Sequence, residues 1–381
     1  MNKKLLMIPG PCDIEEDVLL EMSKQVVAHY GEDWVEVYNE TRNLLKRLLN
    51  TTGEVFIANG SGHLAIEAML TALGEKGEEI ALVENGHFSH RMVELLESYR
   101  LKPKIMPVEW GHIATPEQVE NFLKQNNDVK SLVVVHSETS TGALNPIKEI
   151  AEVAKKMDVL FAVDAVSSVG VVPIDMEDWG IDFCATASQK GLGTPPGLAI
   201  LAVSNRALDF VRSRKKPIPG WYANLEVWDR FNTEGKEFQP FYISLAVSIV
   251  VALKKSLENI FKEGLENRYE RHRKISKLMK EGVRACGLTT VSKDSECTPA
   301  ITVIRFPYGM DSGEFVSYLS DEYNIQVANG LGPFKGKTVR VGHMGKNATK
   351  NNVLQVLFGL ESFLRKKNND LNVGLSLRQI D

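Results

Sequence analysis

Long apolar runs and an excess of one charge are both absent from this chain of 381 residues. No stretch approaches the roughly 18 uninterrupted apolar residues of a membrane span, and the apolar run before Pro9 has only four residues, fewer than a signal peptide needs. The 45 Lys and Arg residues against 49 Asp and Glu give a net charge of −4, which provides no general attraction to nucleic acid or an anionic membrane. We therefore expect a soluble, cytoplasmic protein with neither partner.

Cysteine is also scarce. The four cysteines, Cys12, Cys184, Cys286 and Cys297, show no CxxC spacing, which excludes a disulfide scaffold and fits a reducing compartment. A composition with 43% hydrophobic and 25% charged residues is that of an ordinary globular protein. A chain of this length forms two or three domains and buries a large core without disulfides or metals.

Short apolar segments alternate with amphipathic ones from about residue 54 to 205. The apolar segments are β-branched and nearly continuous, which is typical of strands covered on both faces. They lie at 54–59, 79–85, 103–110, 131–138, 159–166, 182–188 and 198–204. Their alternation with helical patterns predicts an α/β fold with a mostly parallel sheet. A Gly- and Pro-rich loop without a helix joins the last two segments, which predicts an antiparallel edge.

The pattern changes after about residue 205. Residues 217–243 are rich in aromatics, Pro and Gly and have no period, which predicts a long ordered loop or a subunit contact. Two long helices follow, and short strands then mix with further helices. We predict an N-terminal arm (1–15), a large domain (16–255) and a smaller C-terminal α+β domain (256–381).

A glycine-rich turn follows the first predicted strand. Gly60-Ser61-Gly62-His63 leads into a helix, where backbone N–H groups and the helix dipole bind an anion such as phosphate. Gly60, Gly62 and Ala65 also satisfy the dinucleotide fingerprint, with Glu84 at the end of the next strand. The motif alone leaves three alternatives open: a plain tight turn, a dinucleotide site or a site for another phosphate ligand.

An acid and a lysine end two consecutive predicted strands. Asp164 ends the segment VLFAVD, and Gln189-Lys190 follow the next strand. Open α/β sheets bind ligands at this edge. Pyridoxal phosphate uses such a pair, because the lysine forms a Schiff base and the aspartate keeps the pyridine nitrogen protonated. A surface lysine and a capping aspartate would explain either residue alone, but the pair with an upstream phosphate turn favours pyridoxal phosphate.

Six motifs together resemble one family. They are GSGH, NGHFSHR, HSETSTG, VDAVSSVG, SQKGLGTPPG and VRVGHMG, and the likeness runs from Pro9-Gly10-Pro11 to the C-terminal helix. The chain resembles class V pyridoxal-phosphate-dependent aminotransferases, above all the alanine–glyoxylate and serine–pyruvate (serine–glyoxylate) branch. The resemblance implies the fold-type I (aspartate aminotransferase-like) architecture. It also implies a homodimer, with active sites near the subunit interface, that transaminates between serine or alanine and pyruvate or glyoxylate.

The resemblance further assigns roles to single residues. It implies that Lys190 forms the Schiff base and carries the proton at the substrate Cα, and that Asp164 faces the pyridine nitrogen. Arg340 would bind the α-carboxylate through two parallel hydrogen bonds. The remaining cofactor contacts implied are an aromatic ring stacked on the cofactor, a hydroxyl beside its 3′-oxygen and a phosphate group site: Phe88, Thr139, and Ser61, Gly62, His63 and Gln189.

The sequence departs from the family at one contact. The family supplies a Thr, often with a nearby Tyr, from the neighbouring subunit to the cofactor phosphate, and EFQPFYISLAV lacks this Thr. Gln239, Tyr242 and Ser244 remain candidates for the contact.

Three other interpretations are weaker. A cysteine desulfurase or lyase typically has His, not Gln189, before the lysine, and Cys297 has no glycine-rich loop around it. An NAD-dependent dehydrogenase leaves Lys190 without a role. His87 and His90 have helical ligand spacing but no convincing third ligand, so we expect no metal. We expect the basic cluster 212–216 and the helix 268–280 to form solvated faces.

Overall fold

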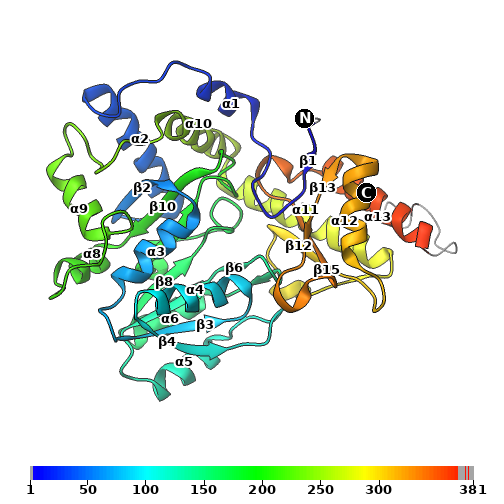
Figure 1. Cartoon of the computed structure of the whole chain (residues 1–381), viewed down its shortest axis with the longest axis horizontal. Coiled ribbons are helices and arrows are strands. Elements are labelled where there is room, and N and C mark those ends of the chain that lie inside the picture. The colour runs from blue at the N-terminus through cyan, green and yellow to red at the C-terminus, as the bar shows by residue number, and fades with distance from the viewer. Residues whose placement is uncertain (1–2, 368–373, 375, 377–381) are drawn as a thin grey trace.

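A seven-stranded sheet forms the centre of the N-terminal part of the molecule (Figure 1). The computed structural model describes residues 3–367, 374 and 376. The spatial order is β2 (Glu54–Gly60), β10 (Gly197–Val203), β9 (Phe183–Ala187), β8 (Leu160–Asp164), β5 (Ser131–Val135), β3 (Glu79–Glu84) and β4 (Lys102–Pro107). Every residue of β5, β8 and β9 is buried, as expected for strands covered on both faces.

The sheet is mostly parallel, which confirms the predicted α/β class. Strands β3, β4, β5, β8 and β9 pair in parallel, and β10 is antiparallel to both β9 and β2. The antiparallel pairing of β10 is confirmed, but its predicted place at the edge is wrong. Strand β2 pairs with the free side of β10 and is itself the edge strand, because strand order depends on long-range pairing.

Helices follow the strands and cover the sheet (Figure 1). The four predicted between the strands are present: α3 (Gly62–Ala72), α4 (His87–Ser98), α5 (Pro116–Gln125) and α6 (Ile147–Lys156). Thr115 begins α5 through a capping box, in which its hydroxyl accepts from Gln118 N at 3.2 Å. Because β2 runs parallel to β9, the carboxyl ends of β2, β3, β5, β8 and β9 all meet at one edge of the sheet.

Residues 217–243, which we predict as a long loop or a subunit contact, contain the helix α9 (Leu225–Glu234). The structure therefore corrects the prediction of a loop. The side chain of Asn224 begins the helix by accepting from Glu226 N and Val227 N. Further helices of this part are α1 (Glu16–Met22), α2 (Glu32–Leu49), α7 (Met176–Trp179) and α8 (Asn205–Arg212). Helix α10 (Val247–Glu263) packs on α1 and α2.

The C-terminal part has its own sheet and core (Figure 1). Its strands lie in the order β11 (Thr289–Thr290), β12 (Ile301–Arg305), β15 (Thr338–Gly342) and β14 (Ala328–Asn329). Helices α11 (Leu265–Ala285), α12 (Ser312–Tyr323) and α13 (Lys350–Lys367) pack with it, and short 3-10 turns lie at Asp294–Glu296, Gly332–Phe334 and Gly345–Asn347. The N-terminal strand β1 (Leu5–Leu6) crosses over to pair with β13 (Ile325–Gln326).

The two basic segments are mostly the solvated faces that we predict, since the side chains of Lys216 and Lys277 are 72% and 74% exposed, but each segment contains one buried arginine. The side chains of Arg214 and Arg268 are 4% and 8% exposed, because each donates to backbone carbonyls of neighbouring segments. Arg273 on α11 is exposed as predicted. Among the described helices, none is long and apolar enough to cross a membrane.

A buried carboxylate joins three strand ends, which gives a test of the fold. Asp182 accepts from Phe161 N and from Ser204 Oγ, each at 2.9 Å, and its side chain is 4% exposed. We expect Asp182→Ala to lower the free energy of unfolding by about 2 kcal/mol, because both buried donors lose their acceptor. Denaturant unfolding measures the change.

The control is Asp158→Asn, which removes the other carboxylate that pairs with Arg206. This side chain is 96% exposed, so the change should stay within about 0.5 kcal/mol. Equal losses in the two variants would contradict the role of Asp182.

Candidate active site

Asp164 and Lys190 lie together at the carboxyl edge of the parallel strands. Asp164 ends β8, and Lys190 follows the end of the neighbouring strand β9. The Asp164 carboxylate accepts from Val166 N at 2.9 Å, which fixes it in the turn. The Lys190 ammonium donates to the carbonyl of Pro9, so the N-terminal segment passes directly over the lysine. The sequence did not predict this contact.

Burial shifts both groups toward their neutral forms. It raises the pKa of Asp164 to about 7, and the negative charge of Glu138 adds to the shift. It lowers the pKa of Lys190 to about 8, with a further lowering from the positive charge of Arg340. An appreciable fraction of the Lys190 amine is therefore unprotonated near neutral pH, as a nucleophile requires.

The glycine-rich turn forms an anion cradle beside this pair. Ser61 precedes α3 without capping it through its side chain, and within the described residues no acceptor binds the N–H groups of Gly62 and His63. A Cβ on Gly62 would lie 2.9 Å from Val166 Cγ2 and 3.2 Å from the Ala187 Cβ. Only glycine lets the N-terminus of α3 lie so close to the turns after β8 and β9.

Glu138 organises a neighbouring helix N-terminus, and sequence reasoning missed it. This fully buried carboxylate accepts from Phe88 N and Ser89 N at 3.0 Å with one oxygen. Its other oxygen accepts from Ser140 N and Oγ at 3.0 and 2.6 Å. It thereby joins the first turn of α4 to the turn between β6 (Ser137–Glu138) and β7 (Ala143–Leu144). The available signal was a glutamate at the end of the predicted strand segment 131–138.

The remaining predicted cofactor residues surround the same edge. Phe88 is half-buried in the first turn of α4, and Thr139 is buried in the turn after Glu138. Gln189 Oε1 is buried and has no hydrogen-bond partner within the part of the chain that the structure describes. Buried polar atoms are normally paired, so this amide indicates a polar group that the chain itself does not supply.

Arg340 brings a positive charge to the site from the other part of the molecule. It lies on β15 opposite Val303 of β12 and Ala328 of β14, and its Nε donates to Asn329 O at 2.8 Å. Among the described residues, no carboxylate lies within ion-pair distance of its guanidinium and no acceptor binds its terminal nitrogens. Burial lowers its pKa to about 10, so it remains charged at neutral pH.

Two histidines converge on a second arginine that the sequence did not reveal. The Nη1 and Nη2 atoms of Arg91 lie 3.2 Å from His63 Nε2 and 2.9 Å from His87 Nε2. Burial and the charge of Arg91 lower the pKa of both histidines, which therefore accept as neutral rings. His90 instead contacts Glu84, so the predicted spacing does not bring His87 and His90 together.

The three candidates for the missing phosphate contact differ in their surroundings. The Tyr242 hydroxyl donates to Tyr222 O, whereas Ser244 is exposed and lies 3.1 Å from His29 Nε2. Gln239 is partly exposed.

A nucleophilic lysine beside a buried acid and an anion cradle provides what pyridoxal phosphate needs from a protein. On this α/β fold the combination defines a fold-type I pyridoxal-phosphate enzyme. The family model "Aminotransferase class-V" matches residues 15–356. The chain therefore belongs to the class V aminotransferase family, and both the predicted enzyme class and its cofactor are confirmed.

Known proteins of this family resemble the chain over nearly its full length. An uncharacterized aminotransferase of Methanocaldococcus jannaschii is 36% identical over 364 residues, which cover 96% of this chain and 93% of that protein. Alanine–glyoxylate aminotransferase of Rattus norvegicus is 32% identical over 95% of this chain and 88% of its own. The crystal structure of ureidoglycine–glyoxylate aminotransferase from Bacillus subtilis superposes with a TM-score of 0.94 at 31% identity, over 99% and 97% of the chains.

The raised pKa of Asp164 predicts a pH dependence of the cofactor-free protein. Because the pKa of Asp164 is higher in the folded than in the unfolded state, protonation of its carboxyl makes its full contribution to the free energy of unfolding below about pH 4. This contribution is lost as the pH rises through about 7. Between about pH 5 and pH 7.5 the wild type should lose about 2 kcal/mol more stability than Asp164→Asn, which cannot ionise.

Denaturant unfolding at the two pH values measures the difference. Asp178→Asn, a change at an exposed aspartate, should reproduce the wild-type pH dependence. If Asp164→Asn does so as well, the Asp164 carboxyl is not held protonated by its surroundings.

Proposed function

We propose that this aminotransferase moves an amino group from serine or alanine to pyruvate or glyoxylate by a ping-pong mechanism. The observation that carries the proposal is the guanidinium of Arg340, which is anchored through Nε while its terminal nitrogens have no partner among the described residues. An amino acid and a 2-oxo acid share an α-carboxylate, so one planar fork serves both half-reactions. The relatives named for glyoxylate support the acceptor.

In this proposal Lys190 binds the cofactor covalently and then moves the proton at the substrate Cα. Bound pyridoxal phosphate acts as an electron sink for that carbon. Asp164 would face the pyridine nitrogen and hold its proton. The positive charge of this protonated nitrogen would let the buried Asp164 carboxyl ionise. Phe88 would stack on the ring, and Thr139 would lie beside the 3′-oxygen.

The phosphate group binds at the N-terminus of α3. The unpaired N–H groups of Gly62 and His63 donate to it, together with the hydroxyl of Ser61. The unpaired amide of Gln189 completes the cradle, since its oxygen and nitrogen can exchange places to present a donor.

A small monocarboxylic substrate suits the charges around Arg340. Arg91 and Arg340 both lower the pKa of His87, but the terminal nitrogens of Arg91 already contact the neutral rings of His63 and His87. Of these two arginines, Arg340 is therefore the one whose terminal nitrogens have no partner in the described part of the chain and can bind a carboxylate. A second carboxylate at the far end of the substrate would lack such a partner and would lose its hydration.

The active unit in this proposal is a homodimer in the cytoplasm. Val26, Trp221 and Phe238 are 66%, 53% and 60% exposed, and Phe238 stacks on Tyr30 at 5.4 Å. A second copy would cover this apolar surface. Tyr222 connects it to the cradle by donating to Asn59 O at 2.9 Å, so the interface lies beside the active site.

Two further features belong to this proposal. Gln239, Tyr242 and Ser244 remain the candidates for the neighbouring subunit's phosphate, and the hydroxyls of Tyr242 and Ser244 already contact their own chain. The separate cores support a large and a small domain, and we propose that the arm, the large domain and the small domain divide near residues 15 and 255, although the large core still includes Leu257 and Ile260.

The Arg340→Ala variant, assayed with a panel of substrates, tests the proposal. We expect cofactor binding to persist while kcat/KM falls roughly 30- to 1,000-fold for serine, alanine, pyruvate and glyoxylate alike. Arg340→Lys should recover part of the loss, because a single ammonium cannot make two parallel hydrogen bonds. In the wild type, the small monocarboxylates should react faster than aspartate or 2-oxoglutarate.

Arg305→Ala is the matched control, since this exposed arginine lies on the neighbouring strand β12. It should leave kcat/KM unchanged. A loss confined to the amino donors would show that Arg340 binds something other than the shared carboxylate. A preference for dicarboxylates would overturn the proposed substrate class.

A further inference from the structure

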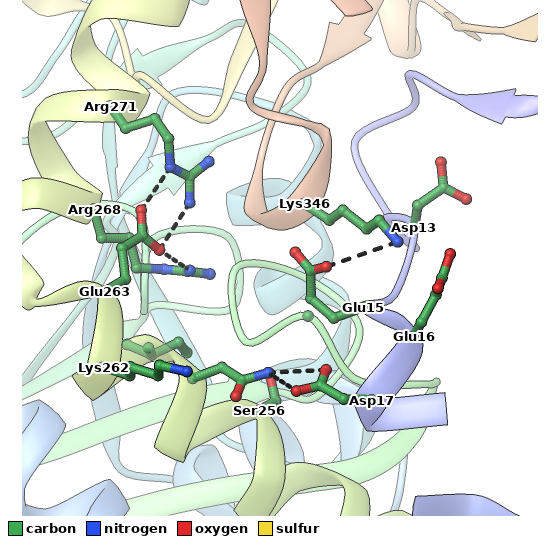
Figure 2. A pocket seen from close by; sticks show the side chains of 13 residues that line it. Asp13, Glu15, Glu16, Asp17, Ser256, Lys262, Glu263, Arg268, Arg271 and Lys346 are labelled. Carbon is green, nitrogen blue, oxygen red and sulfur yellow. Dashed lines mark hydrogen bonds and ion pairs between the residues drawn. The ribbon is translucent and has the colours of Figure 1, made fainter. Parts of the chain in front are cut away.

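Three charged side chains meet where α10 ends and α11 begins. Glu263 is the last residue of α10, and Arg268 and Arg271 lie in the first turns of α11. Figure 2 shows both guanidinium groups converging on the Glu263 carboxylate. Arg268 Nη1 donates to Glu263 Oε2 at 2.8 Å, and Arg271 Nε donates to Oε1 at 2.6 Å. We call these three residues the Glu263 cluster.

Arg268 joins the two loops that carry Asp164 and Lys190. Its Nε donates to Gly170 O at 2.8 Å and its Nη2 to Gly191 O at 2.7 Å. Gly191 directly follows Lys190, and Gly170 lies in the segment after Asp164. The loops also touch each other, because a Cβ on Gly170, whose φ is +74°, would lie 2.8 Å from Gly191 O. One buried guanidinium therefore fixes the distance between the two loops.

Arg271 holds the loop that follows Arg340. Its Nη1 donates to Gly345 O at 2.9 Å and to Ala348 O at 3.0 Å, just beyond the strand β15 on which Arg340 lies. The adjacent His272 accepts from Gly345 N at 3.0 Å. Burial lowers the pKa of this histidine well below its usual value, so the ring stays neutral and can accept.

The cluster differs from an ordinary ion pair on the same helix. Arg273 and Glu270 lie 2.9 Å apart with about half of each side chain exposed, and Arg273 binds no backbone group of another segment in the described structure. Arg268 is 8% exposed and donates from Nε, Nη1 and Nη2 to three separate segments. Arg271 lines a cavity of about 710 Å³, and its side chain is 31% exposed (Figure 2).

We propose that Glu263, Arg268 and Arg271 are positioning residues of the active site. Arg268 sets Lys190 against Asp164, Arg271 sets the loop beyond Arg340, and Glu263 holds the two arginines in one arrangement. The proposal rests on the proposed roles of Lys190 and Arg340. It predicts that the two arginines affect different kinetic parameters, because one acts through the lysine that moves the proton and the other through the arginine that binds the carboxylate.

Kinetics of the holoenzyme test this division. Arg268→Gln should lower kcat about 30-fold with KM within about threefold, since a small misplacement of a reacting group slows the chemical step. Arg271→Gln should raise KM about tenfold for the amino donor and the oxo acceptor, with kcat within about threefold. The control Arg273→Gln should change neither. Arg268→Lys, which keeps the charge opposite Glu263, should recover part of the lost kcat.

Hydrogen–deuterium exchange of the cofactor-free protein gives a readout that is independent of activity. Arg268→Gln should speed exchange in 189–194, where Gly193 N binds Lys190 O. Arg271→Gln should speed it in 343–348. The pH titration of the visible absorbance of the lysine-bound cofactor should shift in Arg268→Gln and not in Arg271→Gln.

The outcomes separate this proposal from the proposed function. Turnover by Lys190→Ala would overturn the proposed function itself. An inactive Lys190→Ala together with wild-type kcat in Arg268→Gln and Arg268→Lys would overturn only the positioning role. Equal changes in kcat and KM in the Arg268 and Arg271 variants, in proportion to their loss of melting temperature, would assign the cluster to stability alone.

Discussion

The burial of two groups of opposite charge, side by side at the ends of β8 and β9, is the constraint on which the site depends. Burial favours the neutral form of each group, so Asp164 gains a pKa of about 7 and Lys190 one of about 8. The same surroundings make the amine reactive and leave the carboxyl ready for a cationic partner. The close approach at Gly62 keeps the anion cradle beside this pair.

Local sequence order explains why much of the site was predictable. Apolar strands end at or just before Asp164, Lys190 and the Gly60–His63 turn, and strands that pair in parallel bring their ends to one edge. The helices α3 to α6 have clear periods and were predicted for the same reason. The place of β10 inside the sheet and the helix α9 were not, because pairing partners and tertiary packing decided them.

Two residues that the sequence did not reveal, Glu138 and Arg268, act across long chain separations. Glu138 binds the backbone at Phe88, and Arg268 binds carbonyls at Gly170 and Gly191. In the sequence, Arg268 belongs to a charged helix that also carries exposed residues such as Arg273. No helical periodicity in the sequence distinguishes the buried Arg268 from the exposed Arg273. The difference comes from the loops whose carbonyls reach the Arg268 guanidinium.

In the proposed function, the two sheets of the molecule contribute different parts of the site. The large sheet supplies Asp164, Lys190 and the cradle, and the small sheet supplies Arg340. The N-terminal segment pairs with β13 and then crosses Lys190 at Pro9. Together with the Glu263 cluster, this segment connects both sheets to Lys190. Distant parts of the chain therefore meet at the lysine.

Borohydride reduction of the holoenzyme, followed by peptide mass spectrometry, tests the central claim most directly. The mass of the reduced cofactor should appear on the peptide that contains Lys190 and on no other lysine. Lys190→Ala should carry no label and no turnover while still binding the cofactor noncovalently. A label on a different lysine, or full activity of Lys190→Ala, would contradict the role of Lys190.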